Sequence, residues 1–275
     1  MPSAVRITLA SAIARVYGRC MSALHTATPS LPIRALSFAI ALVVVAGVAV
    51  GALLALDYEW RWGAVWSYRQ IYFDGWVATL AIAAIALPAS CVLGLVFALA
   101  RRASFLPLRY ISRIYVELTR GAPLLVQIYL YFYVFGHVLR MESRYIAGPL
   151  ILATFTGAYI SEIIRAGIES VGRSQLESAR AIGLTTAQTY RFVIFPQAIR
   201  QVLPGLAGQF VSLVKDSSLL SIIALNEFTQ AGTNVNSFTF APFESYLPLA
   251  VGYLIITLPI SLWTQRLESR LKFDT

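Results

Sequence analysis

Ser174-Gln-Leu-Glu177-Ser-Ala-Arg-Ala-Ile-Gly183-Leu-Thr185-Thr-Ala-Gln188 is the centre of a polar stretch, residues 169–200, in a chain that is otherwise mostly apolar. Two capping boxes, Ser174 with Glu177 and Thr185 with Gln188, each predict the start of a helix. Gly183 lies between them, where a left-handed residue would end the first helix. We therefore expect two short helices joined by a tight turn. Pro196 and Pro204 should mark the exit from the stretch, because proline donates no backbone hydrogen bond.

The composition is that of an integral membrane protein. Of the 275 residues 58% are hydrophobic and 13% are charged, and the mean hydropathy is +0.69. The formal net charge of +9 could indicate nucleic-acid binding, but the arginines are scattered between apolar spans and form no patch. Cys20 and Cys91 predict no disulfide framework, and His25 and His137 have no partners at metal-ligand spacing. The sequence therefore predicts an all-α membrane fold without a metal site.

Apolar segments of membrane-spanning length occur six times. They cover residues 35–56, 76–100, 115–138, 148–168, 203–225 and 246–263. Gly121-Ala122-Pro123 should break or kink the third of them. We expect residues 106–115 to form a short connector along the membrane surface and residues 226–244 to form a polar loop outside the membrane.

The distribution of basic residues predicts the orientation. Sixteen basic residues would lie on the side of the termini and of the polar stretch, and four on the other side. By the positive-inside rule, both termini and residues 169–200 are cytoplasmic. Residues 1–34 are then a cytoplasmic tail with a possible surface-lying helix over residues 4–21, and the Trp- and Tyr-rich residues 57–75 an external loop at the membrane interface.

Two charged residues fall inside the fifth expected span. Lys215 and Asp216 would lie near its middle, where a charge costs at least about 2.5–3.5 kcal/mol. Two explanations remain open. Lys215 is part of an ion pair that fixes packing, with Asp216 or Glu117 as its partner, or Lys215 and Ser217 border a translocation cavity. Glu162 and Arg165, at the end of the fourth span, are better explained as a structural salt bridge.

The polar stretch resembles the cytoplasmic coupling loop of ABC importer permeases. Glu177-Ser178-Ala179, Gly183 and Val193-Ile194-Phe195-Pro196 stand at the spacing of that family's Glu-Ala-Ala, Gly and Ile-x-Leu-Pro. Ser178, Val193 and Phe195 depart from the pattern in residue type. The resemblance implies that residues 169–200 dock on an ATPase subunit, with Glu177, Ser178, Ala179, Gly183 and Pro196 as the coupling residues.

Further segments resemble the polar amino acid subfamily of type I importers, which carries histidine, glutamine or glutamate. They are Thr79-Leu80, Tyr115-Val-Glu117-Leu-Thr-Arg120-Gly121-Ala-Pro123-Leu-Leu-Val-Gln127, Gly157-Ala-Tyr159-Ile-Ser-Glu162-Ile-Ile-Arg165, Pro196-Gln-Ala and Lys215-Asp-Ser-Ser-Leu219. Ala122, Ser174 and Gly208 depart from the subfamily's usual residues. The resemblance covers about residues 75–268, which implies a five-helix permease domain there and an additional N-terminal helix within residues 1–74.

The resemblance also implies roles for single residues and partners. The substrate pathway would include Thr79, Gln127, Lys215, Asp216 and Ser217. Structural or gating roles would fall to Glu117, Arg120, Pro123, Glu162 and Arg165. The chain itself would hold no cofactor, since ATP and Mg would bind to the partner ATPase, and the sequence has no Gly-x-x-x-x-Gly-Lys-Ser/Thr motif.

The expected assembly is an ATPase dimer, a second permease subunit that is identical or paralogous, and an extracytoplasmic amino acid-binding protein, in the bacterial inner membrane. A permease for another small polar solute is the alternative, followed by a stand-alone channel or secondary carrier. An intramembrane enzyme is disfavoured, because no span carries a catalytic constellation of Ser/His, Asp/Asp or His-Glu-x-x-His. The amino acid transported is left open.

Overall fold

The computed structural model describes residues 31–55, 58–141 and 143–271, and these are helical apart from turns and short connections. The chain divides between Glu59 and Trp60 into two compact units. In the first unit, α2 (Leu31–Leu54) covers the first expected span. Most of the expected cytoplasmic tail, including residues 4–21, lies outside the described residues. The division of the permease domain at residues 74 and 75 stays a prediction.

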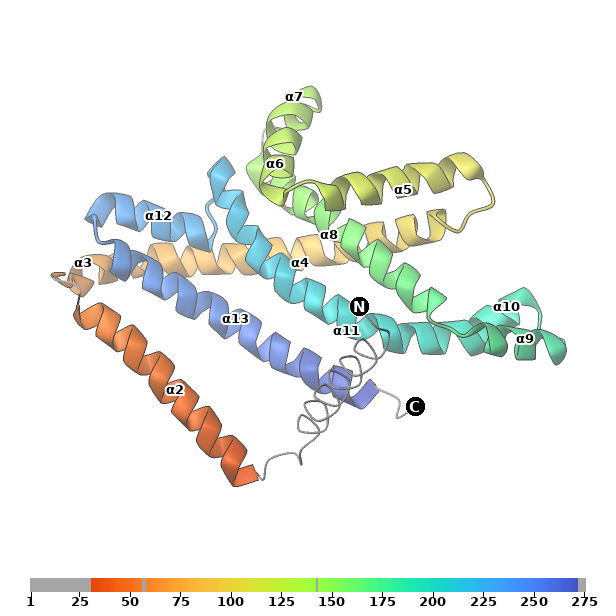
Figure 1. Ribbon diagram of the computed structural model, residues 1–275. Helices are drawn as coiled ribbons and strands as arrows, with labels where there is room; N and C mark the ends of the chain where they lie inside the picture. The colour runs from red at the N-terminus through yellow and green to blue at the C-terminus, as the bar shows by residue number, and fades with distance from the viewer. Residues whose placement is uncertain (1–30, 56–57, 142, 272–275) are drawn as a thin grey trace, which may run out of the picture. The chain divides into compact units, whose positions relative to one another are not determined.

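The second unit contains all the other helices of the described residues (Figure 1). They are α3 (Trp62–Trp66), α4 (Arg69–Ala100), α5 (Leu106–Gly121), α6 (Leu124–Tyr129), η1 (Leu130–Phe135), α7 (Gly136–Val138), α8 (Arg144–Glu169), α9 (Arg173–Ala181), α10 (Thr186–Thr189), η2 (Tyr190–Ile194), α11 (Phe195–Asp216), η3 (Ser217–Ile223), α12 (Phe228–Thr239) and α13 (Pro242–Leu271).

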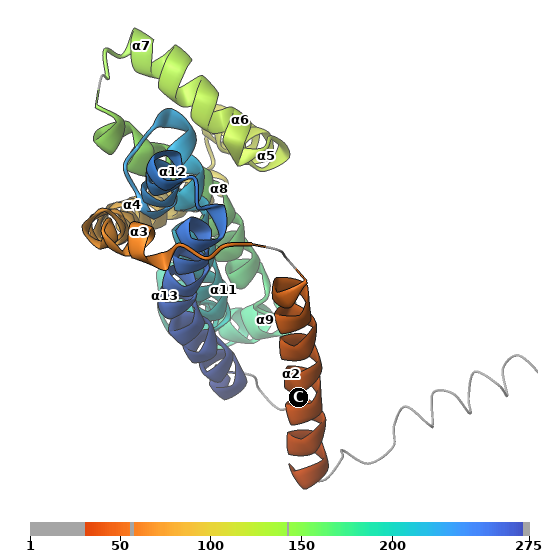
Figure 2. The same cartoon turned by 90° about the vertical axis from the view of Figure 1, so that its left-hand side faces the viewer.

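The described residues include four helices that are long and apolar enough to cross a membrane. They are residues 69–100, 144–169, 186–223 and 242–267. A fifth span is possible as a bent pair, since the chain bends by 114° between α5 and the α6–α7 segment (Figures 1 and 2). The predicted break at residues 121–123 is therefore confirmed. The apolar part of α2, Ala35–Val48, is shorter than these four spans. A sixth span at α2 therefore stays a prediction.

The core of the second unit forms where α4, α8 and α11 pack together. Its largest buried side chains include Ile128, Leu152, Leu213 and Leu220. The approach of α4 to α8 needs a residue without a side chain at Gly94, because a Cβ atom there would overlap the side chain of Ile160. This close packing holds α4 and α8 in a fixed relation, and both helices carry polar residues at the same end.

Four expectations about the connections are wrong. Residues 57–75 are not a loop throughout, because α3 occupies Trp62–Trp66 and α4 begins at Arg69. Residues 226–244 are not a loop, because α12 occupies most of them and buries Phe228, Ala231 and Val235. Residues 106–115 are not a separate connector, because α5 continues through them to Gly121. Pro196 and Pro204 do not mark the end of a helix. Pro196 occupies the first turn of α11, where no intrahelical N–H bond is required, and α11 continues through Pro204.

Candidate functional site

The polar stretch folds into α9 and α10, which lie together at one end of the second unit (Figure 1). The capping box at the start of α10 is confirmed, since the N–H of Thr185 donates to Oε1 of Gln188 at 2.9 Å and the N–H of Gln188 donates to Oγ1 of Thr185 at 3.3 Å. The capping box predicted at Ser174 is wrong. Helix α9 begins two residues earlier than that box requires, with Gly172 as its N-cap, so Ser174 lies inside the first turn.

The turn between the two helices depends on Gly183. Its φ of +79° places it in the left-handed region, as predicted. The N–H of Gly183 donates to the carbonyl of Arg180 at 3.0 Å, and the N–H of Leu184 donates to the carbonyl of Ala179 at 3.0 Å. This is the Schellman arrangement, which satisfies carbonyl groups at the end of a helix. A residue with a β-carbon would strain it.

The two helices have one face that packs on the chain and one that faces solvent. Ala179 is buried, and Leu176 of the same helix packs against a small cluster formed by Val171, Ile194 and Ala198. A groove of about 390 Å³ opens outward between α9 and the segment that follows α10. Its lining residues are Ser174, Gln175, Ser178, Ala179, Ile182, Leu184, Phe192, Val193 and Gln197.

The rim of this groove contains exposed apolar side chains next to polar ones. Ile182 and Phe192 are both exposed, as are Glu177, Ser178 and Pro196 among the predicted coupling residues. Exposed apolar groups with a polar surround are typical of surfaces that bind another protein. Four of the predicted coupling residues, Glu177, Ser178, Ala179 and Gly183, thus lie on α9 and the turn that follows it, and Pro196 lies in the first turn of α11. All of them except Ala179 are exposed to a partner.

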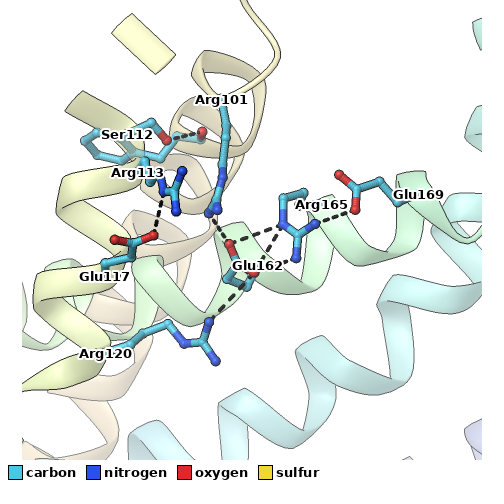
Figure 3. A network of polar contacts seen from close by, with 9 residues as sticks. Arg101, Ser112, Arg113, Glu117, Arg120, Glu162, Arg165 and Glu169 are labelled. Atoms are coloured by element: carbon cyan, nitrogen blue, oxygen red, sulfur yellow. Dashed lines mark hydrogen bonds and ion pairs between the residues drawn. The ribbon is translucent and has the colours of Figure 1, made fainter. Parts of the chain in front are cut away.

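A charged cluster lies close to the same end of the unit (Figure 3). The carboxylate of Glu162 on α8 contacts three guanidinium groups: that of Arg101 at the end of α4, that of Arg120 on α5 at 3.7 Å, and that of Arg165 at 2.8 Å. Arg165 also contacts Glu169. The predicted Glu162–Arg165 salt bridge is therefore confirmed, and it belongs to a network that joins the ends of three helices.

The sequence did not reveal the partner role of Arg101. It is 61 residues away from Glu162 along the chain, and no local pattern relates the two. The neighbouring Arg102 donates to the hydroxyl of Tyr190 at 3.2 Å, which connects α4 to η2. The network around Glu162 therefore stabilises the region next to α9 and α10.

Glu117 was proposed as a partner of Lys215, but the structure pairs it with Arg113 at 2.7 Å on the exposed surface of α5.

Gln127 is placed at the break between α5 and α6. Its Nε2 atom donates to the carbonyls of Thr119 at 2.7 Å and Ala122 at 2.9 Å. These carbonyls belong to a helix end that is followed by Pro123, which has no N–H to offer them. The buried amide of Gln127 therefore stabilises the bend. A role in the substrate pathway stays a prediction.

Other residues of the predicted pathway also bond within the chain. Thr79 is fully buried, and its Oγ1 accepts the N–H of Phe228 at 3.1 Å. Ser217 is fully buried and donates to the carbonyl of Val214 at 2.8 Å. Lys215 and Asp216 are the last two residues of α11, which ends where the 3-10 helix η3 (Ser217–Ile223) begins, so they stand at the end of α11 and not at its middle. Lys215 is exposed and Asp216 is half-buried, so both remain accessible.

Two buried carboxylates at the α12 end of the unit were not predicted. Glu227 accepts the N–H groups of Thr229 at 2.9 Å and Gln230 at 2.7 Å, and the hydroxyl of Tyr253 at 2.9 Å. Burial raises the pKa of the Glu227 carboxyl, and these bonds oppose the rise. Glu244 is also fully buried and accepts the backbone N–H of Arg61. A Glu directly before a helix is the only local signal that could have identified Glu227 as a cap.

The comparisons with known proteins agree on one class. Residues 90–273 match the family described as "binding-protein-dependent transport system inner membrane component". A probable glutamine ABC transporter permease from Bacillus subtilis (strain 168) is 39% identical over 204 residues, which cover 74% of this chain and 94% of the relative. The glutamine transport system permease of Escherichia coli (strain K12) is 32% identical over 217 residues, which cover 78% of this chain and 99% of the relative.

A solved structure supports the same assignment. It is an amino acid ABC transporter crystallised with histidines, and one of its chains superposes with a TM-score of 0.72 at 34% identity, covering 78% of this chain and all of that one. The chain therefore belongs to the family of binding-protein-dependent transport system inner membrane components. Within it, the chain is a multi-pass permease subunit of the ABC importer type.

Proposed function

We propose that this chain forms the translocation path of an importer for polar amino acids. A separate ATPase binds to residues 169–200, and its conformational changes during ATP hydrolysis are transmitted to the path through this stretch. The observation that carries the proposal is the solvent-facing pair α9–α10, whose turn requires Gly183 and whose outer groove exposes Ile182 and Phe192. The glutamine and histidine named for the relatives and for the solved structure support a polar amino acid as the substrate.

The proposal includes the remainder of the assembly. ATP and Mg bind to an ATPase dimer, and this chain contributes no catalytic residue. A second permease subunit, identical or paralogous, completes the path, and an extracytoplasmic binding protein delivers the amino acid. The complex lies in the bacterial inner membrane with both termini cytoplasmic, which the distribution of arginines supports.

Gly183→Val tests the coupling step. A β-branched residue at φ +79° costs about 1–2 kcal/mol in the left-handed region, so the turn should open and misalign α9 with α10. We expect uptake of radiolabelled glutamine, and the ATPase activity stimulated by the loaded binding protein, to fall at least tenfold, roughly the effect of a cost of about 1.4 kcal/mol. The complex should still assemble in the membrane.

The matched control is Gly172→Thr in the same stretch. Gly172 is the N-cap of α9 with φ −59°, which a β-branched residue adopts without strain, and Thr is about as favourable an N-cap as Gly, so uptake should stay close to that of the wild type. Normal uptake by an assembled Gly183→Val complex would contradict the coupling role. Uptake that continues without the ATPase subunit would instead favour a stand-alone channel or secondary carrier.

Lys215→Met tests the proposed pathway. Lys215 is exposed at the end of α11, and Glu117, one of its suggested partners, is paired with Arg113, so the change should leave the thermal stability of the complex unaltered. Loss of uptake at unchanged melting temperature would support a role of the ammonium group toward the carboxylate of the substrate. Unchanged uptake, or a large loss of stability, would remove Lys215 from the pathway.

A further inference from the structure

A small basic cavity lies where α4 ends and α5 begins. It has a volume of about 260 Å³, and its lining residues are Arg101, Leu106, Arg109, Tyr110 and Arg113. Three of the five are arginines, and they come from both sides of the short connection between the two helices. The cavity is separate from the groove on α9 and α10, with which it shares no lining residue.

The arginines of the cavity are not fully neutralised by carboxylates. Within the described residues, Arg113 contacts Glu117 through Nε alone, and Arg101 contacts Glu162 through Nη1 alone (Figure 3). Arg109 has no ion pair with a carboxylate anywhere in that part of the chain. Glu162 is shared with Arg120 and Arg165. The set of cavity and network residues therefore has five arginines (Arg101, Arg109, Arg113, Arg120 and Arg165) and only three glutamates (Glu117, Glu162 and Glu169). An excess of two positive charges remains.

An apolar stripe begins at the cavity and runs along α5. It consists of Leu106, Tyr110, Ile114 and Leu118, spaced four residues apart and hence on one face of the helix. These side chains are between 55% and 68% exposed. At 1.5 Å per residue the stripe is about 18 Å long. Its first two residues also line the basic cavity, so the positive charge and the apolar surface form one continuous feature.

We propose that this cavity and stripe bind an anionic phospholipid of the surrounding membrane. The phosphate lies among the guanidinium groups of Arg101, Arg109 and Arg113, which offer paired N–H donors of the geometry that phosphate oxygens accept. An acyl chain covers the stripe on α5. A soluble phosphate compound would satisfy the arginines but leave the stripe exposed, so charge and apolar surface together favour a lipid. Basic pockets between membrane helices are suited to such headgroups.

The test uses the full-length chain purified with its partner subunits and stripped of lipid in detergent. Native mass spectrometry measures the binding of a short-chain phosphatidylglycerol and of the phosphatidylcholine with the same chains. We expect the anionic lipid to bind more tightly, and Arg109→Gln to weaken its binding about fivefold while the zwitterionic lipid is unaffected. Arg109 is exposed, so this variant should fold, which its melting temperature will show.

Two variants and one further probe separate the possible outcomes. Arg140→Asn removes an exposed arginine outside the cavity and should not change the preference between the two lipids. Ile114→Ser interrupts the stripe and should weaken both lipids. Equal binding of the two lipids, or equal losses in Arg109→Gln and Arg140→Asn, would overturn the proposal. Displacement of the anionic lipid by millimolar inorganic phosphate, with no effect of Ile114→Ser, would assign the cavity to a soluble anion.

Discussion

The two ends of the second unit stabilise carboxylates in opposite ways. At the α12 end, Glu227 and Glu244 are fully buried, and the partners described for them are backbone N–H groups and a hydroxyl. At the α9 end, Glu162 is 17% exposed and its partners are guanidinium groups that are 24–44% exposed. Figure 1 shows these two regions towards opposite ends of α4.

This difference separates a fixed end from an adaptable one. Backbone donors have one position each, so the carboxylate of Glu227 fixes the start of α12 against Tyr253 on α13. Guanidinium groups are carried on long side chains and offer several donors, so Arg101, Arg120 and Arg165 can exchange contacts with Glu162 as their helices move. The adaptable end is the one beside the proposed ATPase contact.

The largest loss of stability is expected for Glu227→Ala. The change removes the acceptor for two buried N–H groups and for the Tyr253 hydroxyl, which should lower the free energy of unfolding by roughly 2–4 kcal/mol. Thermal unfolding of the purified complex measures the effect. A variant as stable as the wild type would show that the α12 end does not depend on this cap.

A smaller loss is expected for Glu162→Gln, which leaves three arginines without their shared carboxylate. Removing one partner of a fully buried pair costs about 3–5 kcal/mol, but these groups are partly exposed and solvent screens them, so we expect roughly 1–3 kcal/mol. Unlike the loss in Glu227→Ala, this one should shrink in high salt.

The control for Glu162→Gln is Glu117→Gln, which removes a carboxylate from the exposed pair with Arg113 on the same side of the unit. It should produce no measurable change in melting temperature. If both variants lost equal stability, or if salt had no effect on the Glu162→Gln loss, the network around Glu162 would not act as a set of partly exposed ion pairs.

The smallest effect concerns pH. Because burial raises the pKa of Glu227, the folded chain holds this proton more tightly than the unfolded chain does. The contribution of Glu227 to stability is then complete below the ordinary pKa of 4.5 and declines as the pH rises through the raised value. Glu227→Gln stays neutral, so its melting temperature relative to the wild type should rise with pH. A relative melting temperature that falls with pH would show that the charged carboxylate is the stabilising form.

Local sequence chemistry was sufficient to predict several backbone features of the second unit. The turn at Gly183, the capping box of Thr185 and Gln188, and the break before Pro123 each depend on a few adjacent residues, and the structure contains all three. The resemblance of these motifs to permeases of one family also gave the class correctly. Where a residue's own backbone preference decides the structure, a single sequence was sufficient.

Tertiary contacts account for what was missed. Helix α12 is rich in Asn, Thr and Ser, and it is a helix because Glu227 caps it and because Phe228 and Val235 are buried. The contact of Arg101 with Glu162 joins residues from two helices that meet only after folding. Lys215 was placed too far from its helix end because the expected span continued to residue 225, whereas α11 ends at Asp216 and the 3-10 helix η3 follows it. No pattern of neighbouring residues contains this information.

The segment Thr186–Ile223 forms one nearly continuous helical rod of 38 residues. At 1.5 Å per residue the rod is about 55 Å long, with Pro204 close to its midpoint. A tilt of such a rod by about 10° around its midpoint would displace each end by about 5 Å in opposite directions. Lys215 and Asp216 lie on the arm beyond Pro204, so the same tilt would move them opposite to α10.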